Sequence, residues 1–110
     1  MDTTILLKEA EQLKAAITAN RRTLHQNPEA GPDLPETAAY VKRRLEEMGY
    51  APRDLAGGVT ADITGADTGR CILLRADMDA LRIQEETGLE FRSENGNMHA
   101  CGHDCHTAML

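Results

Sequence analysis

The hydrophobic residues near the start of the chain recur at intervals of three, four and seven, which is the spacing of one helix face. They are Leu6, Ala10, Leu13, Ile17 and Leu24. Thr3 or Thr4 can cap the start of this predicted helix. The helix must end before Pro28, because the residue that precedes a proline disfavours helical geometry.

A second helix is predicted after the polar loop at residues 26–33. Asp33 and Glu36 stand three residues apart, as in a capping box, and Pro35 falls in the first turn, where its missing N–H costs nothing. Gly49 is placed to terminate the helix. The hydrophobic residues between them again follow spacings of three and four, at Ala38, Val41, Leu45 and Met48.

The periodicity then changes. Residues 58–65 alternate hydrophobic and polar side chains, which predicts a strand with one solvated face, and residues 65–70 predict a turn. Residues 71–81 open with four consecutive hydrophobic residues, including Cys71, as expected of a strand buried on both faces. A loop or hairpin is predicted at residues 82–97, and a helix from near Asp104. This order of elements predicts the α/β fold class.

Composition and charge narrow the possible functions. The chain has 110 residues, enough for one domain, and a formal net charge of -6 that argues against nucleic-acid binding. No run approaches the ~18 hydrophobic residues of a membrane span, and the N-terminus lacks the pattern of a secretory signal. The three cysteines, an odd number, argue against a disulfide framework and favour a cytoplasmic location.

Residues that bind metals are concentrated in the last segment, MHACGHDCHTAML, at residues 98–110. Cys101 and His103 are two apart, and alternate side chains of an extended backbone point to the same side, so a thiolate and an imidazole can converge on one ion. Both are ligands of zinc and of neighbouring first-row metals. Asp104 can cap the following helix or accept a hydrogen bond from a ligand.

The other histidines of this segment have two interpretations each. His106, with Cys105, is a ligand or a side chain that the helix turns away from the metal. His99 fits a structural residue or a neighbour of the ligands better than a ligand.

Two aspartates follow the predicted buried strand, at the end where open α/β sheets build their sites. We expect Asp77 to orient a metal-bound histidine through its second ring nitrogen, and the role of Asp79 stays open. His25, on the first helix, is expected to be a surface or packing residue, although a role in substrate binding also stays open.

Three segments, LLRADMDAL, TGLEFRS and GNMHACGHDCHTAML, resemble in this order the bacterial and plant amidohydrolases that cleave N-acyl amino acids. These are the hippurate hydrolases, aminoacylase-like enzymes and auxin-conjugate hydrolases of metallopeptidase clan MH. The upstream segments RRTLHQNPE and ETAAYVKRRLEEMGY also look like this family, so that the similarity runs from about residue 20 to the end.

The resemblance implies an α/β/α sandwich catalytic domain with two divalent metal ions, commonly Zn, Mn, Co or Ni, and small-molecule N-acyl amino acids as substrates. The Cys-Gly-His motif of the family falls on Cys101 and His103, which would be the first two ligands. Asp77 carries over as the orienting residue, because Arg75 stands where related carboxypeptidases have a ligand histidine. His106 matches a family position.

Length is the largest departure from the family, whose members run to several hundred residues and carry their other ligands, the general-base Glu and a lid or dimerisation domain downstream. Residues 1–110 are therefore expected to form an incomplete N-terminal segment of the catalytic domain, inactive by itself, of an enzyme that is a homo-oligomer at full length. Smaller departures affect loops: Arg82 and Glu90 replace family prolines, and Leu34 replaces an acid. Unpaired strand edges would make such a segment marginally stable or prone to association.

The alternative is a small zinc-binding module that is not an enzyme. Cys101, His103, Cys105 and His106 could close around one zinc ion as a structural site. Four ligands within six residues would strain a tetrahedral site, so the enzyme segment is the preferred interpretation.

Overall fold

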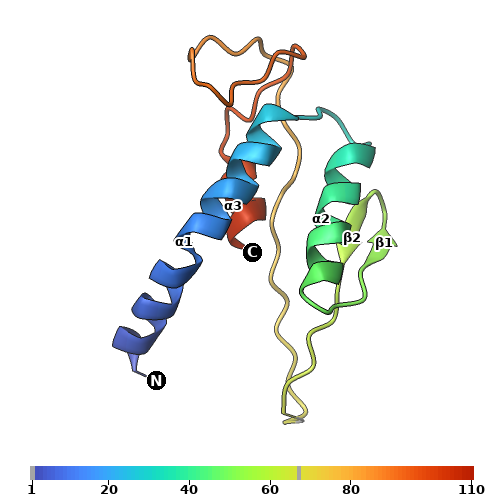
Figure 1. The fold of residues 1–110 in the computed structure, drawn as a ribbon. Coiled ribbons are helices and arrows are strands. Elements are labelled where there is room, and N and C mark those ends of the chain that lie inside the picture. Colours follow the sequence, from blue (N-terminus) through green and yellow to red (C-terminus); the bar gives the residue numbers. More distant parts are fainter. Residues whose placement is uncertain (1, 67) are drawn as a thin grey trace.

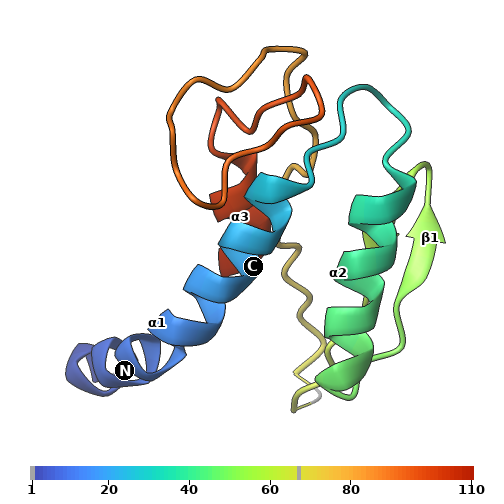
Figure 2. The same ribbon diagram turned by 45° about the horizontal axis from the view of Figure 1, so that its top comes forward.

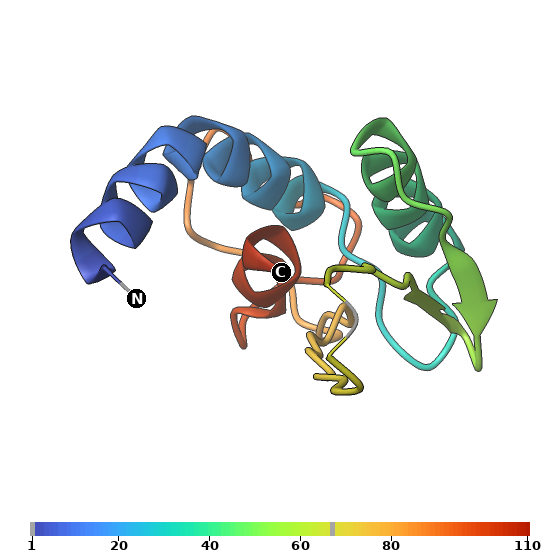
Figure 3. The ribbon, with the colours of Figure 1, turned by 90° about the horizontal axis from the view of Figure 1, so that it is seen from below.

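The computed structural model describes residues 2–66 and 68–110. Its elements are α1 (Thr3–Gln26), α2 (Pro35–Glu47), β1 (Arg53–Leu55), β2 (Gly58–Thr60) and α3 (His103–Met109). The β1–β2 hairpin lies beside α2 (Figures 1 and 2). In Figure 3, which shows the molecule from below, α1 and α2 form one layer, and α3 packs against one face of α1 outside that layer. None of the helices in the described part of the chain is long and apolar enough to cross a membrane.

Helix α1 has the predicted extent but a different cap. Asp2, rather than Thr3 or Thr4, is the N-cap, and its carboxylate accepts a hydrogen bond from the Thr4 N–H at 2.9 Å. The helix ends at Gln26, as Pro28 requires. Its hydrophobic face is buried only near the C-terminal end: Leu24 is 5% exposed, whereas Leu6 and Leu13 are 45% and 56% exposed.

The start of α2 corrects the predicted capping box of Asp33 and Glu36. The N-cap is Leu34, which makes no side-chain cap. The carboxylate of Glu29, in the preceding loop, instead accepts hydrogen bonds from the backbone N–H groups of Glu36 at 3.3 Å and Thr37 at 2.6 Å. A side chain from outside the helix thus satisfies the free N–H groups of its first turn.

The end of α2 is as predicted. Gly49 follows the C-cap Met48 and has a φ of +90°, a conformation that side chains with a Cβ adopt at a cost. Its N–H donates to the Glu46 carbonyl at 2.9 Å, and the Tyr50 N–H donates to the Leu45 carbonyl at 3.0 Å. These are the two bonds of a Schellman motif.

The strand prediction at residues 58–65 is confirmed only over Gly58–Thr60, which pairs with Arg53–Leu55 in an antiparallel hairpin that the sequence analysis missed. The turn predicted at residues 65–70 includes Asp67, which lies outside the described residues. Residues 82–97 form a loop, as expected.

The buried strand predicted at residues 71–81 is wrong in this structure. The segment runs singly on the side of the α1–α2 layer where α3 also lies (Figure 3), and Ile72, Leu73 and Leu74 are 84%, 87% and 70% exposed. Cys71, expected in the core, is exposed as well. A strand needs a neighbour to form its ladder, and among the described residues this segment has only isolated bridges at its end, Ala30 with Ala80 and Leu81 with Met98.

Most of the buried side chains among the described residues are polar, and His25, Glu85, Ser93 and Asp104 gather where α1, α3 and the loop of residues 82–97 meet. The buried hydrophobic side chains among the described residues are Leu24, Leu34 and Ala80. The buried polar ones are His25, Thr37, Glu85, Ser93, His99 and Asp104. Hydrogen bonds must therefore compensate much of the burial in this region.

Candidate metal centre

Helix α3 brings two histidines to the end of the extended segment. Gly102, with a φ of +83° that favours glycine, turns the chain into α3, whose first residue is His103. The hydroxyl of Thr107, one turn later, donates to the backbone carbonyl of Asp77 at 2.7 Å. This bond fixes α3 against the segment that carries Asp77.

Three side chains converge at this contact: Asp77, His103 and His106 each offer a ligand atom, and these atoms lie within 4.8 Å of one another. Asp77 Oδ1 is 3.3 Å from His106 Nδ1, and Asp77 Oδ2 is 3.9 Å from His103 Nε2. The two imidazole rings are stacked, with centroids 5.5 Å apart. The cluster is partly open to solvent, because His106 is exposed and the other two residues are half-buried.

Asp79 fixes the orientation of His103. Both the backbone carbonyl and the carboxylate Oδ1 of Asp79 lie 2.9 Å from His103 Nδ1. Two acceptors at one ring nitrogen require that nitrogen to carry the hydrogen. The lone pair of His103 is therefore on Nε2, the nitrogen that faces Asp77, which is the tautomer a metal ligand needs.

Asp77 is held in its ionised form. Partial burial would raise its pKa, but hydrogen bonds from its own backbone and from His106, with the nearby charge of Arg75, lower the pKa below its ordinary 3.8. Arg75 Nη1 lies 2.9 Å from Asp77 Oδ2. A carboxylate that stays charged in this way is available to a cation without the release of a proton.

The donor set of the cluster fits a divalent metal ion. Two imidazoles and one carboxylate are the ligand types of zinc and of neighbouring first-row metals, and three protein ligands with an open fourth position are typical of catalytic zinc sites. The preset tautomer of His103 adds to this fit, because the ring does not have to reorient before it binds.

The remaining candidate residues lie around this cluster rather than in it. Cys101 is exposed, and the described structure does not include it in the group with His103. Cys105 is half-buried and also lies outside the group. Asp104 does not cap α3, whose N-cap is Gly102; its side chain points away from the cluster to α1.

His99 is buried, at 4% exposure, and neither of its ring nitrogens has a hydrogen-bond partner among the described residues. Burial lowers the pKa of His99 below its ordinary 6.5, although the charge of Asp104 opposes this. The ring is therefore neutral at physiological pH, and the expectation that His99 is a structural residue or a neighbour of the ligands stays a prediction.

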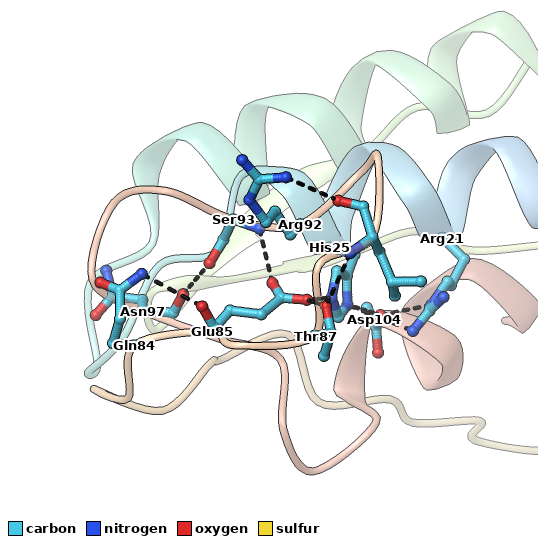
Figure 4. A network of polar contacts seen from close by, with 10 residues as sticks. Arg21, His25, Gln84, Glu85, Thr87, Arg92, Ser93, Asn97 and Asp104 are labelled. Carbon is cyan, nitrogen blue, oxygen red and sulfur yellow. Dashed lines mark hydrogen bonds and ion pairs between the residues drawn. The ribbon is translucent and has the colours of Figure 1, made fainter.

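A buried network of polar contacts connects α3 to α1 and to the loop (Figure 4). Asp104 Oδ2 lies 2.7 Å from Arg21 Nε and 2.8 Å from His25 Nδ1. On the other side of the ring, His25 Nε2 lies 2.8 Å from Glu85 Oε1. Glu85 also accepts hydrogen bonds from the Thr87 hydroxyl at 2.7 Å and, through Oε2, from the Ser93 N–H at 2.7 Å.

The sequence pattern did not point to Glu85, and for His25 it left open a surface or a packing position, of which the buried one is found. The partners of His25 stand 79 and 60 residues away in the chain, at separations that no local spacing reports. Asp79, whose role was open, is the residue that holds His103 Nδ1. For His25 the sequence offered a weak signal. His25 lies close to Arg21 and Arg22 on α1, and it directly follows Leu24, the last residue of the hydrophobic face of the helix, which is buried.

The segment that carries this cluster is similar to known metallopeptidases and amidohydrolases. Residues 73–110, which include the whole cluster, match the model of peptidase family M20/M25/M40. N-acetyl-L-cysteine deacetylase of Bacillus subtilis is 50% identical over 101 residues, which are 89% of this chain and 24% of that protein. Hippurate hydrolase of Campylobacter jejuni is 42% identical over 108 residues, 96% of this chain and 28% of that protein.

The fold comparison agrees with the sequence comparison. A crystal structure of a Bacillus subtilis dinuclear metal binding peptidase from the M20 family superposes with a TM-score of 0.82 at 42% identity, over 89% of this chain and 28% of that one. The expected fold class, part of an α/β metallopeptidase domain, is thereby confirmed. The chain spans about a quarter of the length of the curated relatives it matches.

Proposed function

We propose that this chain, of which residues 73–110 match peptidase family M20/M25/M40, forms the N-terminal segment of the catalytic domain of a metal-dependent amidohydrolase. The reaction is hydrolysis of the amide bond in N-acyl amino acids, small molecules on which two relatives act according to their names, N-acyl-L-amino acid amidohydrolase and hippurate hydrolase. The observation that carries the proposal is the convergence of Asp77, His103 and His106 inside the segment that matches the family.

In this proposal Asp77, which the sequence analysis expected to orient a histidine, instead holds a divalent ion together with His103 and His106, because Asp79 takes the orienting position on His103. Cys101, two residues before His103, is the further ligand suggested by the sequence. Two divalent ions, of Zn, Mn, Co or Ni, would supply Lewis-acid polarisation of the acyl carbonyl. The residues of this chain orient the site. Asp79 keeps the hydrogen on His103 Nδ1, and hydrogen bonds from the backbone and His106, together with the charge of Arg75, lower the pKa of Asp77.

The rest of the site lies outside these residues in our proposal. Further metal ligands and a general-base glutamate, which takes a proton from the attacking water and passes it to the leaving amine, would come from other parts of the protein. We also propose a cytoplasmic, homo-oligomeric enzyme that binds neither nucleic acid nor membranes. The free cysteines support the cytoplasmic location. The net charge of -6 supports the expectation that the enzyme does not bind nucleic acid.

The zinc-module alternative has less support from the geometry. It needs Cys101, Cys105, His103 and His106 around one ion, whereas the described structure groups the two histidines with Asp77 and with neither cysteine.

The proposal is tested by titration of the chain with Co²⁺, followed by the visible absorption of the bound ion. We expect His103→Ala and Cys101→Ser each to weaken Co²⁺ binding by about tenfold or more. Cys71→Ser is the matched control, because Cys71 is an exposed cysteine outside the cluster, and it should leave the affinity unchanged. Equal affinity in the His103→Ala variant would contradict the site.

Turnover is tested separately. The chain by itself is expected to hydrolyse no N-acetyl amino acid, because the four proposed ligands, Asp77, Cys101, His103 and His106, cannot complete the coordination of two ions. Release of the free amino acid that a chelator abolishes would show that these residues suffice, and the proposed division of the site would then be wrong.

A further inference from the structure

His25 occupies a position that the proposed chemistry does not use. Its side chain is 3% exposed and lies between Asp104 and Glu85, whose side chains are fully buried. Each ring nitrogen is 2.8 Å from one of these carboxylates (Figure 4). An ionised carboxylate only accepts hydrogen bonds, so both contacts are satisfied when both ring nitrogens carry hydrogen. His25 therefore joins α1 to α3 on one side and to the loop of residues 82–97 on the other.

Asp104 is the point at which this network meets α3. Besides His25, it accepts a hydrogen bond from Arg21 Nε at 2.7 Å through Oδ2 and from the Cys105 N–H at 2.9 Å through Oδ1. Asp104 directly follows His103 in the first turn of the helix. Any rotation of α3 that moves the Asp104 side chain out of the network must also move His103.

Helix α3 cannot fix its own orientation. It has only seven residues, and isolated helices of that length are not stable in water, so contacts with other elements must hold it. On one side it is held by Thr107, through the bond to Asp77, and by His103, through the bonds to Asp79. On the other side it is held by Asp104, in the only contact with α1 that is both buried and charged among the described residues.

We propose that His25 is a positioning residue for the candidate metal centre: by holding Asp104 it sets the rotation of α3 and so keeps His103 Nδ1 on Asp79. The role of His103 as a ligand, and hence the consequence for metal binding, rests on the function proposed above. The effect on the His103 ring itself does not, because the contacts with Asp79 exist without a metal.

The direct readout is the tautomer of His103, from the ¹⁵N chemical shifts of its ring nitrogens in the full chain without metal. The chain has four histidines, so the ring signals can be assigned by single substitutions. We expect one fixed tautomer with hydrogen on Nδ1. In His25→Phe, which keeps a ring against Phe91 but removes both donors, we expect averaged shifts of a mixture of tautomers.

Glu85→Gln is the matched control, because it perturbs the same buried network on the side away from α3. His25 can then keep its Nδ1 hydrogen on Asp104 and accept a hydrogen bond from the amide at Nε2. The His103 tautomer should therefore remain fixed. With Co²⁺ as the probe, His25→Phe should weaken Co²⁺ binding about tenfold, which is the lower end of the loss found when hydrogen-bond partners of metal ligands are removed. Glu85→Gln should change the Co²⁺ affinity little.

Every outcome of these measurements either supports or overturns the positioning role of His25. A fixed His103 tautomer in folded His25→Phe overturns the proposal, and so does an equal loss in both variants, which would indicate general loosening. If His25→Phe does not fold, the double variant His25→Phe/Glu85→Gln, which leaves one buried charge fewer without a partner, must show the mixture of His103 tautomers, or the proposal fails. If the unsubstituted chain binds no Co²⁺ while the tautomer still depends on His25, the positioning role stands and the proposed metal function fails.

Discussion

Among the described residues, the buried carboxylates of Glu85 and Asp104 are each compensated by specific hydrogen bonds. Glu85 shows this most clearly: its carboxylate accepts hydrogen bonds from the His25 ring, the Ser93 N–H and the Thr87 hydroxyl. Burial by itself would raise the pKa of Glu85, but these bonds lower the pKa from 4.5 to about 2. A hydrogen bond from His25, together with the charge of the nearby Arg21, likewise lowers the pKa of Asp104 against the effect of burial.

A pH dependence of stability follows from Glu85. Its pKa is lower in the folded chain than in the unfolded chain, so its ionised form stabilises the fold fully above pH 4.5, and this contribution is lost as the pH falls from 4.5 toward about 2. Urea unfolding across this window should show a steep fall in the free energy of unfolding. Glu85→Gln cannot titrate and should flatten the fall, whereas Asp62→Asn, in an ion pair exposed to solvent, should not. Equal slopes for Glu85→Gln and the unsubstituted chain would contradict the prediction.

Among the elements, α2 depends on a residue outside itself. The Glu29 carboxylate accepts hydrogen bonds from two backbone N–H groups of the first turn and, at 2.7 Å, from the hydroxyl of Thr37. It also places a negative charge at the positive end of the helix dipole. The loop between α1 and α2 is thereby tied to the helix that follows it, which sets the position of α2 relative to α1.

Replacement of Glu29 should therefore destabilise α2. We expect Glu29→Gln, which loses the charge and part of the cap, to lower the free energy of unfolding by about 1–2 kcal/mol. Glu46→Gln, an exposed change on the same helix with no side-chain partner in the contacts described, should stay within about 0.5 kcal/mol of the unsubstituted chain. Urea unfolding followed by circular dichroism measures both, and equal midpoints for the two variants would rule out the cap.

At the scale of the whole molecule, the chain is open and exposes hydrophobic surface. Its Cα radius of gyration is 15.5 Å. A compact domain of this length has about 13 Å. Ile72, Leu73 and Leu74 stand exposed on a segment whose backbone groups have no ladder partner among the described residues. Exposed hydrophobic segments with unpaired backbone favour pairing with another chain.

We therefore expect the isolated chain to self-associate. Leu73→Lys places a charge in the middle of the exposed segment and should shift sedimentation toward the monomer. Leu55→Lys, at a similarly exposed leucine in the β1–β2 hairpin, is the control and should change the association less. A monomeric chain with a cooperative unfolding transition of several kcal/mol would contradict this expectation.

The sequence by itself determined what depends on neighbours along the chain. Both long helices follow from the 3.6-residue spacing, the end of α2 follows from Gly49, and the metal chemistry of the last segment follows from residue types that few other functions need. The segments RADMDAL and MHACGHD resemble the amidohydrolases, and this resemblance could be recognised from the sequence because each segment is a continuous local pattern.

Tertiary structure alone decided what depends on distant partners. Four hydrophobic residues in a row predict a buried strand, but a strand also needs a neighbour, and residues 71–79 have none among the described residues. The loop residue Glu29, not the neighbouring Asp33, caps α2, because chain folding brings its carboxylate to the free N–H groups. His25 and Asp104 meet across 79 residues. Such contacts are set by the packing of α1 on α3, which no local spacing encodes.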